Sequence, residues 1–255
     1  MGKHYFISDL HLGASYITDA RAHERRVVDF LDAIKQNAES LFLLGDVLDY
    51  WFEYRNVVPR GHIRFFGKLA ELADAGVRIY WFTGNHDVWL RDYLRDEVGL
   101  EVHYGHTEME VDGTTLFLSH GDDVGRQPAM YRFTRWCFYN PVCQWLYAMI
   151  HPRWTTWVAT GWSAGNRTSR SAEQLKRSQT KALDHLREFA ENYSASHPQI
   201  DAFVFGHLHV ADCSSIGDHA TMVCLGDWLN QDTYAVMEHG EIKLHRWPDS
   251  PTDKE

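Results

Sequence analysis

The stretch VRIYWFTGNHD, residues 77–87, runs from a row of apolar side chains straight into an amide, an imidazole and a carboxylate. Its first part is short and rich in aromatic and β-branched residues, which predicts a buried β-strand. Gly84 is expected to let the backbone turn tightly after that strand, so that Asn85, His86 and Asp87 are held at its carboxyl end. The stretch therefore predicts a strand that ends in a reactive site.

The same arrangement, a short apolar run followed by residue types that bind metals, occurs four more times. The runs are HYFISDLHLG (4–13), SLFLLGDVLD (40–49), TTLFLSHGD (114–122) and DAFVFGHLH (201–209). Their length and composition favour strands over helices. Each predicts a strand with polar residues at its end.

Sequence patterns typical of helices lie between the strands predicted in the first half of the chain. Residues 24–39 place five apolar side chains on one stripe, residues 64–76 end at Gly76 as helices often do, and residues 88–99 predict a short third helix. Alternating strands and helices imply parallel strands with crossover helices. Because ligands gather beyond the carboxyl ends of such strands, we expect the five polar endings to meet at one rim.

The second half of the chain has a different pattern. Residues 109–119 and 234–247 resemble hairpins that turn at Asp112-Gly113 and His239-Gly240, and residues 220–227 predict another strand. We expect a mixed set of strands that forms a second sheet against the first, with helices on the outer faces. The predicted fold class is mixed α/β.

No linker divides the 255 residues, so we expect one domain over 1–255 with a helical insertion at about 126–192. Residues 126–181 carry nine basic side chains and one acidic one, whereas the whole chain has a net charge of −10. The acidic total argues against general binding of nucleic acid.

The insertion is also rich in tryptophan. Residues 126–162 hold five of the ten tryptophans, and charges and prolines interrupt them too often for a membrane span. This composition predicts a lid or an interfacial surface. The alternative is that the aromatic residues form the core of a helical subdomain.

Four cysteines without a C-x-x-C pair indicate reduced thiols in a cytosolic protein. The first residues, MGKHYFISDL, enter a strand-like run without a basic and then apolar signal region. We therefore predict a cytoplasmic location.

The polar strand endings supply the residue types that bind transition metals. They are Asp9, His11, Asp46, Asn85, His120, His207 and His209. Carboxylate, imidazole and amide oxygen suit Mn²⁺, Fe²⁺ or Zn²⁺ better than Ca²⁺. Seven ligands are too many for one ion, so we predict two ions that share Asp46. Two divalent ions keep a net positive charge even after Asp9, Asp46 and a bridging hydroxide offset part of it. A positive centre attracts an anionic phosphoryl group, so we predict a phosphate substrate.

His86 and Asp87 are the predicted catalytic residues. His86 is expected to face the substrate, as a proton donor or as a group that stabilises a phosphoryl oxygen, and Asp87 is expected to orient it. Phosphorylation of Asp9 as a nucleophile is a weaker alternative, because the downstream imidazoles would then have no purpose.

The five motifs together resemble the signature of the calcineurin-like metallophosphoesterase superfamily. They are DLH (9–11), GDVLD (45–49), GNHD (84–87), SHGD (119–122) and GHLH (206–209), and the resemblance spans residues 4 to about 230. It implies a four-layer αββα sandwich with a di-metal centre. It also implies two ligand sets, which are Asp9, His11, Asp46 and His209 for one ion and Asp46, Asn85, His120 and His207 for the other.

Within that superfamily the sequence resembles the UDP-2,3-diacylglucosamine pyrophosphohydrolase family of lipid A biosynthesis. The residues that carry this resemblance are SDLHLG, GDVLDYWFE and the helical insertion that ends in WSAGNRTSRS. It implies a hydrolase that cleaves a pyrophosphate at the α-phosphorus, usually with Mn²⁺, to give UMP and 2,3-diacylglucosamine 1-phosphate. It further implies that the insertion caps the site and holds acyl chains.

A nucleotide-linked glycolipid needs apolar area beside positive charge, and the insertion offers both. We therefore expect peripheral contact with the inner membrane through the insertion. The predicted substrate contacts are Asn85, His86, Ser163, Asn166, Arg167 and Arg170.

Two positions differ from many members of the lipid-pathway family. His86 stands where many have arginine, and Pro128 stands where many have aspartate. The alternative function is a phosphoesterase of the same chemistry that acts on a nucleotide, a phosphoprotein or a nucleic-acid end. A non-catalytic scaffold on this fold would have lost metal ligands, whereas all seven are present here.

Overall fold

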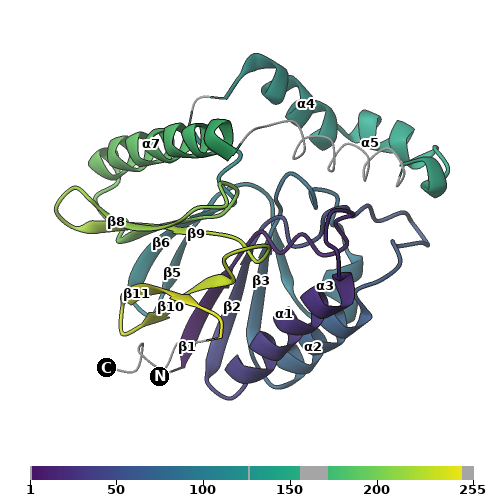
Figure 1. Ribbon diagram of the computed structural model, residues 1–255, viewed down its shortest axis with the longest axis horizontal. Coiled ribbons are helices and arrows are strands. Elements are labelled where there is room, and N and C mark those ends of the chain that lie inside the picture. The colour runs from purple at the N-terminus through teal and green to yellow at the C-terminus, as the bar shows by residue number, and fades with distance from the viewer. Residues whose placement is uncertain (1, 126, 156–171, 249–255) are drawn as a thin grey trace.

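The computed structural model describes residues 2–125, 127–155 and 172–248, which form a mixed α/β fold built around two β-sheets (Figure 1). The first sheet has the order β11-β10-β1-β2-β3-β4. Its strands are β1 (Lys3–Ile7), β2 (Ala38–Leu44), β3 (Arg78–Phe82), β4 (Glu101–His103), β10 (Thr233–Glu238) and β11 (Glu241–Arg246). The central strands β1 to β4 are parallel, as the strand and helix alternation predicted.

The second sheet has the order β5-β6-β7-β9-β8. Its strands are β5 (Thr107–Val111), β6 (Thr114–Ser119), β7 (Ala202–Phe205), β8 (Ala211–Ile216) and β9 (Ala220–Leu225). Strands β6, β7 and β9 run parallel, so the polar residues after β6 and β7 lie at the same edge of this sheet.

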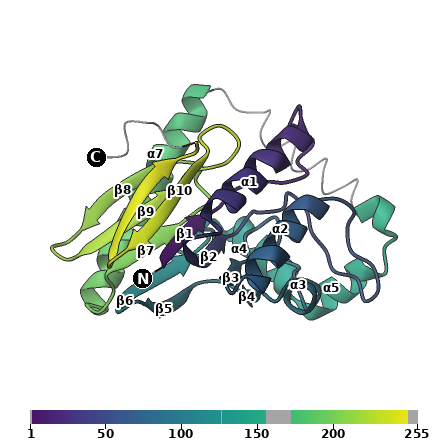
Figure 2. The same ribbon diagram turned by 90° about the horizontal axis from the view of Figure 1, so that it is seen from below.

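The fold contains the helices α1 (Ala20–Ile34), α2 (Ile63–Asp74), α3 (Tyr93–Val98), α4 (Ala129–Tyr139), α5 (Pro141–Ala148) and α7 (Ala172–Ser196). Of these, α1, α2, α3 and α7 cover the outer faces of the two sheets, as Figures 1 and 2 show. One hydrophobic cluster joins α1 and α2 to the first sheet, and another joins α7 to the second sheet. A third cluster lies between the sheets and includes Phe6, Phe42 and Val204. These three apolar interfaces make the four-layer αββα sandwich that the resemblance implied.

Several sequence predictions need correction. The second hairpin, β10 and β11, does not join the second sheet, because β10 pairs antiparallel with β1 in the first sheet. Tyr234 of β10 explains this position, since its ring packs on Tyr5 and Phe30 beneath α1. The third helix is shorter than predicted, and strands β4 and β8 were not predicted.

The predicted insertion divides into two parts. Helices α4 and α5 have no buried residue and stand beside the sandwich (Figure 1). Helix α7 instead contributes the buried Leu186 and Ala190 to a sandwich layer. Within the described ranges 2–125, 127–155 and 172–248, no helix is long and apolar enough to cross a membrane.

Candidate metal centre

The seven predicted ligands follow the carboxyl ends of β1, β2, β3, β6 and β7, and the fold brings these ends together. Two triads of candidate ligand atoms result. They are Asp9, His11 and His209, and Asp46, His120 and His207. Each triad belongs to one of the two ligand sets that the resemblance implied.

Distances inside each triad are short enough for a shared ion. Two atoms bound to one ion at about 2.1 Å each lie at most ~4.2 Å apart. The Asp9 Oδ1 atom lies 3.4 Å from His209 Nε2 and 3.8 Å from His11 Nε2. In the other triad, His120 Nε2 lies 3.4 Å from Asp46 Oδ2 and 3.3 Å from His207 Nδ1.

Asp46 lies between the two triads. Its Oδ2 atom is 3.8 Å from His11 Nε2 and 3.4 Å from His120 Nε2, which belong to different sets. Its Oδ1 atom accepts a hydrogen bond from the His86 backbone N–H at 2.9 Å. A carboxylate in this position is suited to bridge two ions.

Two buried oxygen atoms support a cationic occupant. Among the described residues, Asp9 Oδ1 and Asn85 Oδ1 are buried and have no hydrogen-bond partner. A buried acceptor without a partner is costly, and both of these atoms belong to predicted ligands. The residues present therefore fit divalent cations held by oxygen and imidazole nitrogen.

The pKa shifts of the proposed ligands also favour binding of cations. Burial alone would raise the pKa of the Asp9 carboxyl, but His209 and His11 outweigh burial and lower it. Burial would lower the pKa of the His11 imidazole, but Asp49 and Asp9 raise it to about 9. The site therefore attracts positive charge, and a metal ion would compete with protons for its imidazoles.

The backbone at the site is strained. Five of the seven predicted ligands have a positive φ, a conformation that costs about 1 kcal/mol or more for residues other than glycine. They are Asp9 (54°), His11 (45°), Asp46 (50°), His207 (68°) and His209 (52°). Strain of this kind persists only where the surrounding contacts hold it in place.

Three glycines let these loops approach one another. A Cβ atom at Gly45 would lie 2.4 Å from His120 Nδ1, one at Gly84 would lie 2.2 Å from Asp46 Oδ1, and one at Gly206 would lie 2.7 Å from Ser8 Oγ. Gly84 was predicted to serve a tight turn. It lies outside the left-handed region, so close approach is the reason for glycine at this position.

Three imidazoles are oriented by groups that the sequence analysis did not assign. His11 Nδ1 lies 3.3 Å from Asp49 Oδ1, and His209 Nδ1 lies 3.2 Å from Asp227 Oδ2. His120 Nδ1 donates to the carbonyl oxygen of Leu44 at 2.8 Å. Such partners fix the ring orientation, so that each Nε2 atom points toward the other proposed ligands.

A sequence signal for both carboxylates existed. Asp49 lies within the GDVLD motif, and Asp227 follows a strand and a glycine, as Asp46 does.

The predicted pairing of Asp87 with His86 was wrong. The buried Asp87 carboxylate accepts hydrogen bonds from the backbone N–H groups of Gly84 at 2.7 Å and Val47 at 2.9 Å. Burial and the nearby Asp46 raise the pKa of Asp87 to about 6. His86 is instead held by its Nδ1 atom, which lies 2.9 Å from the carbonyl oxygen of Asp49. Asp87 therefore joins the two ligand loops and does not contact the imidazole that it was expected to orient.

Helix α4 contacts the rim of this site. Arg135 forms an ion pair with Asp122, two residues after His120. Trp89, in the loop after Asp87, donates from Nε1 to the carbonyl oxygen of Phe138 at 2.9 Å. The predicted substrate contacts Ser163, Asn166, Arg167 and Arg170 lie outside the described residues.

The outward face of the same segment is apolar. Nine large side chains are between 47% and 74% exposed, and they are Met130, Phe133, Trp136, Val142, Trp145, Leu146, Met149, Ile150 and Trp154. Side chains so exposed are not packed in a core. Many large apolar side chains left exposed within residues 130–154 favour the prediction of an interfacial surface.

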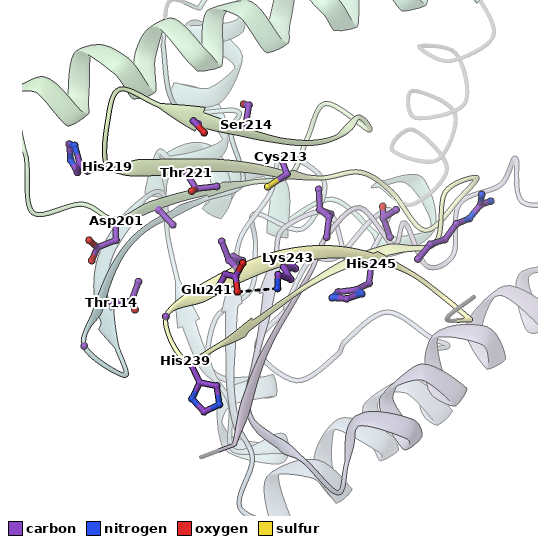
Figure 3. Close-up of a pocket in the computed structure, with 18 residues that line it drawn as sticks. Thr114, Asp201, Cys213, Ser214, His219, Thr221, His239, Glu241, Lys243 and His245 are labelled. Carbon is purple, nitrogen blue, oxygen red and sulfur yellow. Dashed lines mark ion pairs between the residues drawn. The ribbon is translucent and has the colours of Figure 1, made fainter. Parts of the chain in front are cut away.

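A wide cavity lies at the other end of the sandwich. It has a volume of about 1180 Å³ and opens between the edge strands β8 and β11 (Figure 3). Its lining includes Thr114, Asp201 and Thr221, which lie at the amino ends of β6, β7 and β9. The predicted ligands follow carboxyl ends and are not among its described lining residues.

Comparison with known protein families shows to which family this chain belongs. The profile of the calcineurin-like phosphoesterases matches residues 3–211. The chain belongs to this family. The resemblance inferred from the five motifs is confirmed, and so is the enzyme class, a metallophosphoesterase hydrolase.

Two relatives are similar over nearly their whole length. A UDP-2,3-diacylglucosamine hydrolase from Porphyromonas gingivalis is 41% identical over 97% of this chain and 98% of that protein. A protein with the same name from Actinobacillus succinogenes is 26% identical over 93% of this chain and 96% of its own.

Among solved structures, an Escherichia coli phosphoesterase, Yfce, is 17% identical over 96% of this chain and 92% of that chain, with a TM-score of 0.44. The fold assignment rests on the layers described above.

Proposed function

We propose that this protein is a UDP-2,3-diacylglucosamine hydrolase. It would cleave the pyrophosphate bond of its substrate to give UMP and 2,3-diacylglucosamine 1-phosphate. The observation that carries the proposal is the 41% identity to the Porphyromonas gingivalis enzyme of that name over nearly both chains. Six of the seven predicted ligands lie in two groups of candidate ligand atoms, and together with Asn85 they would supply the chemistry that such a hydrolysis needs.

Two divalent ions, with Mn²⁺ as our proposal and Fe²⁺ or Zn²⁺ as alternatives, would share Asp46. Asp9, His11 and His209 would complete one ligand set, and Asn85, His120 and His207 the other. When bound, the ions would activate water and neutralise charge on the phosphoryl group. Asn85 would contribute an oxygen without adding negative charge, which preserves attraction for an anionic substrate.

His86 is the proposed catalytic side chain. A carbonyl oxygen only accepts hydrogen bonds, so the contact with Asp49 places a hydrogen on His86 Nδ1. The Nε2 atom, 3.9 Å from Asp46 Oδ2, then faces the metal rim and is available to exchange a proton or to bind a phosphoryl oxygen. The side chain is 25% exposed, so a substrate can reach it.

Helices α4 and α5 would contact the apolar part of the substrate. Their inner side contacts the rim through Arg135 and Phe138, while Trp136 and Trp145 face outward. A lipid-linked substrate resides in a membrane, and exposed tryptophans favour a membrane interface. We therefore propose peripheral contact with the membrane at this face.

The experiment is a product assay with two substrates. Purified protein with Mn²⁺ is incubated with UDP-2,3-diacylglucosamine and, separately, with a simple nucleotide diester. We expect release of UMP from the lipid substrate, and we expect His120→Ala to abolish it. His185→Ala, at an exposed position of α7, is the matched control that should keep full activity. Cleavage of the diester without cleavage of the lipid substrate would instead favour a phosphoesterase with another substrate.

A further inference from the structure

The two ligand pairs Asp9–His11 and His207–His209 have the same unusual backbone. Both members of each pair have a positive φ, and a leucine separates them. In each case a side chain from a neighbouring helix holds the carbonyl oxygen of that leucine. Helix α1 holds the first pair in this way, and α7 holds the second.

The contact from α1 is made by His23, which is 4% exposed. Its Nε2 atom lies 2.7 Å from the Leu10 carbonyl oxygen, and its Nδ1 atom lies 2.9 Å from Arg26 Nη2. Since a guanidinium only donates and a carbonyl only accepts, Nδ1 is the acceptor and Nε2 carries the hydrogen. Arg26 Nη2 also donates to the Trp228 carbonyl oxygen at 3.0 Å, beside the Asp227 that orients His209.

The contact from α7 is made by Gln179. Its Nε2 atom donates to the Leu208 carbonyl oxygen at 3.1 Å and reaches the His209 carbonyl oxygen at 3.4 Å. Gln231 Nε2 donates to the same His209 oxygen at 2.8 Å. Two amide side chains therefore fix the backbone around one ligand histidine.

We propose that His23 and Gln179 are positioning residues that hold the ligand pairs in their strained conformation before metal binds. Without these donors the left-handed residues are free to relax into commoner conformations. Only the fraction of molecules with a competent loop would then bind metal at full strength, which lowers the apparent affinity. The inference rests on the metal centre of the proposed function and is independent of the substrate.

The test measures binding of Mn²⁺ alone to metal-free protein by isothermal titration calorimetry. His23→Leu and Gln179→Met remove the donors at similar volume. Each is expected to weaken binding at one or both sites by roughly tenfold or more, the usual effect of removing a group that orients a ligand. His23→Gln keeps a donor and should retain most of the affinity. Lys181→Met, at an exposed position of α7, is the matched control and should bind as the wild type does.

The melting temperature of each metal-free variant is measured alongside. Weaker Mn²⁺ binding by His23→Leu or Gln179→Met, with affinity kept in His23→Gln, supports the proposal. Wild-type affinity in both, with or without a lower melting temperature, overturns it and leaves only a structural role. If His23→Leu does not fold, Gln179→Met decides the question in the same way. A wild-type protein that binds no Mn²⁺ would overturn the proposed metal centre itself, which distinguishes the two failures.

Discussion

Gly84→Ala tests how closely the loops of the metal centre must pack. A Cβ atom there would lie 2.2 Å from Asp46 Oδ1 and 2.5 Å from the Asp46 backbone nitrogen, whereas real Cβ contacts under 3.0 Å are essentially never seen. Either the proposed bridging carboxylate or the loop that carries Asn85 must therefore move by close to 1 Å. A misplacement of about 1 Å can cost roughly 10²-fold in rate. We expect kcat to fall by about that factor, with weaker binding of at least one Mn²⁺ ion.

Gly67→Ala is the matched control. Gly67 lies within α2, and a Cβ atom built there meets no atom within 4 Å apart from its chain neighbours and the backbone of its own helix. Alanine in a helix is expected to raise the free energy of unfolding by about 0.5–1 kcal/mol and to leave activity unchanged. Hydrolysis of UDP-2,3-diacylglucosamine, Mn²⁺ titration and thermal melting are measured for both variants. Wild-type turnover and metal binding in Gly84→Ala would refute the close approach on which the site geometry depends.

Three further predictions concern a partner of a ligand histidine, the exposed tryptophans and a surface ion pair. Asp49→Asn should weaken Mn²⁺ binding by roughly 10- to 100-fold, because its carboxylate lies 3.3 Å from His11 Nδ1; unchanged affinity in a calorimetric titration would contradict this. Trp136 and Trp145 are 58% and 61% exposed. Replacing both with serine should reduce cosedimentation of the protein with anionic lipid vesicles by at least tenfold and leave the melting temperature unchanged. Equal cosedimentation of the variant and the wild type would rule out this face as the membrane contact. Lys35 and Lys68 lower the pKa of Glu71 from 4.5 to about 2, so its contribution to stability is present above pH 4.5 and is lost as the pH falls towards about 2. The difference in melting temperature between wild type and Glu71→Gln should shrink over that interval, and a constant difference would show that this ion pair does not stabilise the fold.

The sequence predicted the parts of the fold that local patterns determine. Apolar runs with polar endings located β1, β2, β3, β6 and β7, and the turn residues located both hairpins. The pairing of β10 with β1 was missed because it joins residues more than 200 positions apart, and it depends on how the Tyr234 ring packs under α1. Strand β4 has only three residues and too little pattern to predict.

The proposed ligands could be named from the sequence because aspartate, histidine and asparagine after strand ends are residue types that bind metals. The fold brings six of the seven into two groups of candidate ligand atoms, and metal binding by them stays a prediction. The partner of His86 was predicted from nearness in sequence, and this failed because Asp87 points back to the backbone of Gly84 and Val47. His23 acts through a contact with a separate segment, which no local pattern specifies. Asp227 had a local signal, since it follows a strand and a glycine, but its contact with His209 could not be read from that signal.

We propose that two divalent cations bind at this rim and share Asp46. The decisive measurement is the anomalous diffraction, at the manganese absorption edge, of crystals soaked in Mn²⁺. We predict two anomalous peaks roughly 3.5–4 Å apart, with the Asp46 carboxylate between them and Asn85 Oδ1 bound to one ion. A single peak, or two peaks that do not share Asp46, would show that the proposed two-ion site does not form.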